Sequence, residues 1–194
     1  MTKALKIYVA GKVSPNSVFG THDWRDTFCR VLEEKTGLSL YNLDPTKTPK
    51  ITEWDENDST LVFGRDCFMI SQADIVVVYL TDDISVGGSQ EMLIAKYFQK
   101  PLVGFAARNG KFNKDEKEIG GRRYINWKCP FVSSTCDVVV ENMDKVAEQV
   151  RYFASNKTAT SIKQITLIDE KIKEYKDKCY FKDKELHFGE TRKC

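Results

Sequence analysis

Short apolar runs alternate with amphipathic segments along most of the chain. The apolar runs are rich in β-branched residues and stop at turn-forming residues, which is typical of strands. They cover residues 5–10, 38–43, 74–80, 101–105 and 137–140. Between them, apolar residues recur every three or four positions, which predicts helices. These helices cover residues 23–35, 61–71, 90–99 and 143–153. The alternation predicts a doubly wound, mainly parallel five-stranded α/β sheet, flavodoxin-like or Rossmann-like.

Three segments fall outside this alternation. Residues 46–58 form a long polar loop, and residues 109–128 are basic and aperiodic, which predicts a lid over the sheet edge or a subunit contact. We expect an α/β domain over residues 1–155 and a basic helical extension over residues 156–194. An amphipathic helix is expected in the extension because its apolar residues recur at helical spacing. They are Ile162, Ile165, Ile168, Ile172, Tyr175 and Cys179.

Composition and charge narrow the class of protein. The 194 residues are 41% hydrophobic and 30% charged with a net charge of +2, which is ordinary globular composition and gives no reason to expect a nucleic-acid polymer as partner. Six cysteines without a C-x-x-C pair, and no leader segment, predict reduced thiols in the cytoplasm. No apolar stretch approaches membrane-spanning length. Because there are only two histidines, we expect neither a His-rich metal site nor a Ser-His-Asp triad.

The clearest candidate for chemistry is Glu91. It follows the pair Gly87–Gly88, in a loop expected to lead into the helix from residue 90, just after a buried strand. Glycines let the backbone approach a ligand closely, and ligands of doubly wound sheets bind beyond the carboxyl ends of the strands. The alternative interpretation is that an acidic residue in a first helical turn only stabilises the helix dipole.

Two further residues are candidates only in company with Glu91. Asp66 lies inside the helix expected over residues 61–71, where its simplest role is a partner for Arg65. Tyr8 lies in the first strand and would ordinarily be core, but a phenol near the carboxyl end of a strand can hydrogen-bond a carboxylate.

Common nucleotide-binding fingerprints are absent. Gly87–Gly88 lacks the G-x-G-x-x-G spacing, and Gly11–Lys12 is followed by Val13 instead of Ser or Thr. The sequence therefore gives no support for a dinucleotide cofactor or for P-loop chemistry, and we expect no cofactor.

Four segments together carry a resemblance to a known family. Their sequences are Ile-Tyr-Val-Ala-Gly over 7–11, Asp66 followed by Ile-Ser-Gln-Ala-Asp-Ile-Val-Val over 70–77, Ser-Val-Gly-Gly-Ser-Gln-Glu-Met over 85–92, and Ala95 followed by Lys-Pro-Leu-Val over 100–103. In order and spacing, residues 5–105 resemble the nucleoside 2-deoxyribosyltransferase family and its relatives that hydrolyse the N-glycosidic bond of nucleoside 5′-monophosphates.

The resemblance implies roles for three residues. Glu91 matches the nucleophile that attacks C1′ of the sugar, Asp66 matches the aspartate that assists the departing base, and Tyr8 matches the tyrosine that orients the nucleophile. Two carboxylates with different tasks suit the cleavage of a glycosidic bond through an oxocarbenium-like state. The resemblance also implies a small nucleoside or nucleotide substrate and a homodimer or larger assembly. Apolar residues of the helix over 61–71, Phe63 and Phe68, and the stripe of the extension offer surfaces for it.

One departure bears on the substrate. Transferases of the family tend to carry an aspartate six residues before the glutamate, whereas this chain has Ser85, as the 5′-monophosphate hydrolases do. A serine beside glycine amides suits a phosphate. The candidate substrate-binding residues are Gly11, Lys12, Ser14, Ser85, Gly87 and Gly88. Transfer or hydrolysis, and the identity of base and sugar, stay open. The alternative function is a non-catalytic nucleotide-binding or sensing module on the same fold.

Overall fold

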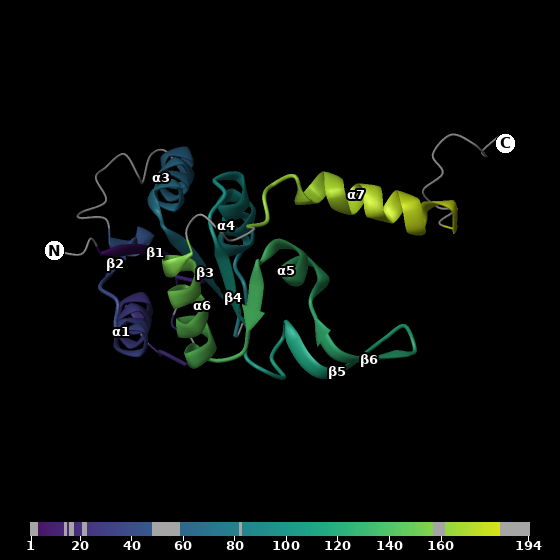
Figure 1. Cartoon of the computed structure of the whole chain (residues 1–194), viewed down its shortest axis with the longest axis horizontal. Coiled ribbons are helices and arrows are strands. Elements are labelled where there is room, and N and C mark those ends of the chain that lie inside the picture. Colours follow the sequence, from purple (N-terminus) through teal and green to yellow (C-terminus); the bar gives the residue numbers. More distant parts are fainter. Residues whose placement is uncertain are drawn as a thin grey trace.

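The centre of the molecule is a five-stranded parallel sheet with strand order β2-β1-β3-β4-β7 (Figure 1). It is seen in a computed structural model, which describes residues 4–13, 15, 18–20, 23–47, 59–81, 83–156 and 162–182. The strands are β1 (Leu5–Ala10), β2 (Leu40–Asn42), β3 (Ile75–Tyr79), β4 (Leu102–Phe105) and β7 (Val138–Val140). The predicted fold class is confirmed, and β2 is shorter than the segment predicted for it.

Helices cover both faces of the sheet, so β1, β3, β4 and β7 contribute side chains to two cores. One core contains Ile7 and Val9 of β1 together with residues of α1 (Trp24–Thr36) and α6 (Met143–Ser155). The other contains Tyr8 and Ala10 with residues of α3 (Ser59–Gln72), α4 (Val86–Tyr97) and the short α5 (Pro130–Thr135), which the sequence pattern did not predict. All residues of β3 are buried, which explains its continuous apolar run.

Helix α4 begins at Val86, four residues before the predicted start, which corrects the placement of Gly87 and Gly88 in a loop. Both glycines lie in the first helical turn. Ser85 caps this turn, because its Oγ accepts a hydrogen bond of 3.0 Å from the backbone N–H of Gly88. A Cβ at Gly88 would lie 3.1 Å from Cγ1 of Ile84 and 3.7 Å from Cα of Gly11, so a glycine there lets the turn pack close to the end of β1.

Residues 109–128 do not form the aperiodic segment that was predicted. Most of them belong to an antiparallel hairpin of β5 (Asn113–Ile119) and β6 (Arg122–Lys128). The strands carry charged residues on both faces and therefore show no apolar alternation. The available signal was the pair Gly120–Gly121, whose φ values of 56° and 74° suit the tight turn of a hairpin.

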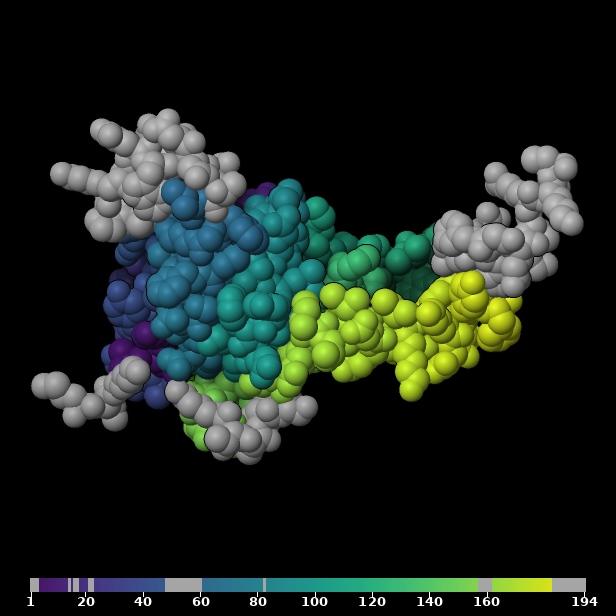
Figure 2. All heavy atoms as spheres, turned by 90° about the horizontal axis from the view of Figure 1, so that it is seen from above, coloured from purple at the N-terminus to yellow at the C-terminus, as the bar shows by residue number. Residues whose placement is uncertain are grey.

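The C-terminal extension contains α7 (Leu167–Lys178), followed by a 3-10 turn over Tyr180–Lys182. It is attached to the sheet through Asp137, whose Oδ1 accepts a hydrogen bond of 2.8 Å from the backbone N–H of Lys163. From there α7 extends away from the α/β domain, as Figures 1 and 2 show. The helix is shorter than the stripe of apolar residues that predicted it.

Candidate active site

Strand β1 and helix α4 bring two of the predicted site residues into direct contact. The fully buried Tyr8 donates a hydrogen bond of 2.8 Å from its hydroxyl to Oε1 of Glu91. The two residues are 83 positions apart in the chain, and the contact forms because α4 packs on the face of β1 that carries Tyr8. Glu91 therefore lies on the first half of α4, and its carboxylate is held by the side chain of the central strand.

The second oxygen of Glu91 makes no comparable contact. Oε2 is buried and has no hydrogen-bond partner among the described residues. Burial raises the pKa of Glu91 to about 7; the Tyr8 hydrogen bond and the charge of Arg25 oppose this rise, and the negative charge of Asp66 adds to it. Glu91 therefore stays protonated to a higher pH than an exposed glutamate does. Burial also raises the pKa of Tyr8, so its phenol stays protonated and remains a donor.

Asp66 belongs to the same electrostatic environment. Its charge raises the pKa of both Tyr8 and Glu91, so the Asp66 carboxylate on α3 lies near the Glu91 carboxylate on α4 and the Tyr8 phenol on β1. Oδ1 of Asp66 is also 3.3 Å from Nε of Arg65, the partner that the simpler interpretation assigned to it. Two carboxylates in one partly dry site can take different protonation states, which acid–base and nucleophilic chemistry both require.

Arg25 is a charged residue at the site that the sequence analysis missed. Its side chain is 2% exposed, and it donates hydrogen bonds of 2.9 Å from Nε to the carbonyl of Val9 and 2.8 Å from Nη2 to the carbonyl of Gly11. The guanidinium thus fixes the end of the strand that carries Tyr8. The signal was available, because Arg25 lies one turn before Phe28 on the apolar face of an amphipathic helix.

Buried polar atoms without a hydrogen-bond partner gather at this edge of the sheet. Such atoms cost free energy when a protein folds, so a cluster of them often marks a place where a ligand or water binds. Within the described residues they include Glu91 Oε2, Arg25 Nη1, Asn42 Oδ1, Asp44 Oδ2 and Thr81 Oγ1. All of them lie at or just beyond the carboxyl ends of β1, β2 and β3, or on the helices packed there.

The predicted substrate-binding residues lie around the first turn of α4. Gly11 directly follows β1, and a Cβ at this position would lie 3.1 Å from the ring of Trp24. Lys12 is the next residue. Nζ of Lys12 is 3.5 Å from Asp83 Oδ2, and Nζ of Lys111 is 2.7 Å from its Oδ1. These lysines and a backbone N–H hold the pKa of Asp83 at about 2.

The N-terminus of α4, with Ser85 and Gly87, suits a negatively charged group. Ser14 lies outside the described residues.

The described residues form neither a cluster of metal-binding side chains nor a membrane-spanning helix. No group of three or more His, Cys, Asp or Glu side chains in this part of the chain could hold a metal ion. No helix formed by these residues combines the length and the apolar character needed to cross a membrane.

Comparison with known proteins gives structural neighbours only. No protein-family profile and no curated protein matches the chain. A conserved protein from Enterococcus faecalis V583 has a TM-score of 0.54 and 16% identity, with 77% of this chain and 99% of that one covered. A 2-deoxyribosyltransferase from the psychrotolerant bacterium Bacillus psychrosaccharolyticus has a TM-score of 0.48 and 16% identity, covering 73% and 90%.

A CMP N-glycosidase from Clostridium botulinum has a TM-score of 0.40 and 10% identity, with 76% of this chain and 98% of that one covered. The chain therefore shares the fold of the Enterococcus faecalis protein.

Proposed function

We propose that the protein cleaves or transfers the N-glycosidic bond of a nucleoside or nucleoside 5′-monophosphate, with Glu91 as nucleophile. The observation that carries this proposal is the state of the Glu91 carboxylate. Tyr8 holds one oxygen, and the other is buried without a partner among the described residues. A carboxylate oriented through one oxygen keeps a lone pair of the other for attack on carbon. The resemblance in sequence supports the same role.

The reaction proceeds in two displacements. In the first, Oε2 of Glu91 forms a bond to C1′ while the C1′–N bond breaks, and the bonding electrons leave with the base, which takes a proton from Asp66. In the second, water or another base attacks C1′, the ester bond breaks, and its electrons return to Glu91. The proton of the attacking group returns to Asp66. Water as acceptor makes the enzyme a hydrolase, and a base makes it a transferase.

A panel of nucleosides and 5′-monophosphates tests the proposal. Each is incubated with the protein, with and without a second nucleobase, and free base and exchanged product are separated by chromatography. Glu91→Gln serves as the blank for the same preparation, and Glu148→Gln, on the exposed face of α6, serves as the matched control. Binding of a nucleotide without release of base from any member would instead support the non-catalytic binding or sensing module.

Within this reaction we favour 5′-monophosphates as substrates. Ser85 and the first turn of α4 present a hydroxyl and backbone N–H groups, which bind phosphate oxygens well. The test is Ser85→Asp, because aspartate also caps helices but repels a phosphate. We expect kcat/KM for the monophosphate to fall at least about tenfold while that for the matched nucleoside stays similar. An unchanged preference would exclude Ser85 as the phosphate-binding residue.

The homodimer implied by the resemblance is part of the proposal. Two exposed apolar surfaces offer an interface. One is on α3, where Phe63 is 56% and Phe68 65% exposed, and the other is the stripe of the C-terminal extension.

A further inference from the structure

The C-terminal helix α7 is amphipathic but leaves its apolar side largely uncovered. Leu167 is the only buried residue among the twelve, and Ile168 and Ile172 are 44% and 47% exposed. Isolated helices of this length are marginal in water, and most helices in proteins gain their stability from packing of the apolar face. The helix therefore needs a partner surface that the described part of the chain does not supply.

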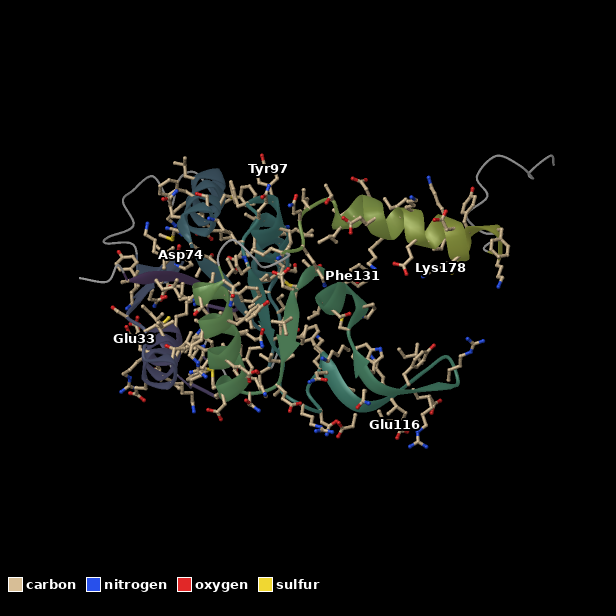
Figure 3. The ribbon with its side chains drawn as sticks, in the orientation of Figure 1. Glu33, Asp74, Tyr97, Glu116, Phe131 and Lys178 are labelled. Atoms are coloured by element: carbon tan, nitrogen blue, oxygen red, sulfur yellow. The ribbon has the colours of Figure 1, made fainter. Side chains whose placement is uncertain are left out.

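A groove runs along this uncovered side. It has a volume of about 530 Å³ and lies between α7 and the helices α4 and α5. Its lining is mostly apolar, and the ring of Phe131 on α5 is 85% exposed beside it. Figure 3 shows Phe131 near the start of α7 and Lys178 at the far end of the helix. Large exposed apolar surfaces of this kind mark interaction sites.

We propose that a second copy of this chain occupies the groove, with the two α7 helices packed antiparallel to each other. The apolar residues of the stripe repeat as in a coiled coil; they are Ile168, Ile172, Tyr175 and Cys179. In an antiparallel pair, Ile172 faces Tyr175 of the second copy and Ile168 faces its Cys179. The pairing is two-fold symmetric, so each copy covers the same surface of the other.

The charged side chains of α7 favour the antiparallel orientation over the parallel one. In the antiparallel pair Asp169 lies beside Lys176 of the second copy, and the symmetry gives two such attractive contacts. In a parallel pair Lys171 would lie beside Lys176 of the second copy, which is repulsive. The antiparallel pair also brings Lys171 near Lys178 of the second copy. Lys171 therefore meets a lysine in either orientation, and it is paired with Glu174 of its own helix in both, as Lys178 is, at 2.7 Å. The attractive Asp169–Lys176 contacts, which only the antiparallel pair forms, thus favour that orientation. The proposal concerns the interface and is independent of the chemistry at Glu91.

A charge swap tests the orientation in the full-length protein. Sedimentation velocity or light scattering at micromolar concentration measures the oligomeric state. We expect a dimer for the wild type, at least tenfold weaker association for Asp169→Lys and for Lys176→Asp, and recovery in the double variant. Far-ultraviolet circular dichroism checks that each variant is folded. Equal association of all four proteins overturns the proposal, as does a monomeric wild type.

Crosslinking tests the register without relying on loss of association. In a Cys194→Ser background, Ile168→Cys should form a disulfide with Cys179 of the second copy under mild oxidation and give a covalent dimer. The same helix cannot form this bond internally, because eleven residues of helix separate the two positions by about 16 Å. Lys173→Cys, on the opposite side of the helix, is the control. A dimer that persists in Ile172→Glu, or equal crosslinking of both cysteine variants, would place the interface elsewhere, for example on α3.

Discussion

Helix α4 carries two ionisable residues with different surroundings: Glu91, which is partly buried in its first half, and Lys96, which is fully buried near its end. Near its start, Glu91 has one oxygen bound by Tyr8 and the other without a partner among the described residues. Five residues later, the fully buried Lys96 donates hydrogen bonds of 2.5 Å to Oδ2 of Asp137 and 2.9 Å to the carbonyl of Lys100. Asp137 is satisfied as well, by backbone N–H groups of Leu102 and Lys163.

The difference separates a site for chemistry from a structural contact. A buried charge is tolerated when it is paired and fully hydrogen-bonded, as Asp137 and Lys96 are. An incompletely satisfied carboxylate is costly, and its cost is recovered only when something binds to it. The two pairs also lie at opposite ends of the parallel strands. Asp137 directly precedes the first residue of β7, whereas Tyr8 and Glu91 meet toward the carboxyl end of β1. We therefore expect substitutions in the two pairs to affect different measurements.

The largest effect is expected for Glu91→Gln on turnover. The amide cannot attack C1′, so the covalent route is lost, and kcat should fall at least about 10³-fold, or about 4 kcal/mol in the activation free energy. Base release under saturating substrate measures this. A kcat within tenfold of the wild type would remove Glu91 from the role of nucleophile.

The next largest effect is expected for Asp137→Ala, in the Lys96–Asp137 pair, and it concerns the free energy of unfolding. Asp137→Ala leaves Lys96 buried without its counter-ion and should lower the free energy of unfolding by about 3–5 kcal/mol. Urea denaturation followed by circular dichroism gives the value. Because the loss comes from the unpaired charge, adding Lys96→Met should recover most of it. A double variant no more stable than Asp137→Ala would contradict this account.

Glu91→Gln should raise the free energy of unfolding at high pH, whereas Asp137→Ala should lower it. The folded-state pKa of Glu91, about 7, exceeds its ordinary value of 4.5. The stabilisation from protonated Glu91 is therefore present below about pH 4.5 and is lost as pH rises through 7. Above pH 8 the ionised side chain costs about 3 kcal/mol, which the glutamine variant avoids. The variant should melt higher than the wild type at pH 8.5 and equally at pH 4.5. Parallel melting curves across this range would count against the shifted pKa.

The smallest effect is expected for Tyr8→Phe. The change removes the donor to Oε1 but keeps the ring, so kcat should fall about tenfold, as one hydrogen bond to a charged group implies. Loss of this donor also raises the pKa of Glu91, so the acid limb of the pH–rate profile should move to higher pH. A purely structural role for Tyr8 would leave the position of that limb unchanged.

The sequence predicted the sheet because its central strands β1, β3 and β4 are buried on both faces and consist mostly of apolar residues. It also predicted that Tyr8, Asp66 and Glu91 act together, through the resemblance and not through periodicity. Arg25 was missed although its position on the apolar face of α1 indicated burial. The Lys96–Asp137 pair was missed because its residues are 41 positions apart in the chain and meet only after folding. The hairpin was missed because its strands carry charged residues on both faces and show no apolar alternation. The roles assigned to the site residues remain predictions.

Each carboxylate oxygen of Asp137 binds a different part of the chain, so truncation of the extension should affect the α/β domain. One of its oxygens binds Lys96 of α4 and the other binds the backbone of Lys163, whose Nζ also reaches the carbonyls of Ser133 and Cys136 at 2.8 Å and 2.6 Å. The beginning of the extension and the helix that carries Glu91 therefore share Asp137 as a hydrogen-bond partner, and we expect them to unfold as one cooperative unit. A shortened chain that ends before Lys163 should show faster amide hydrogen exchange in α4 itself, whereas one that ends after the anchor should not.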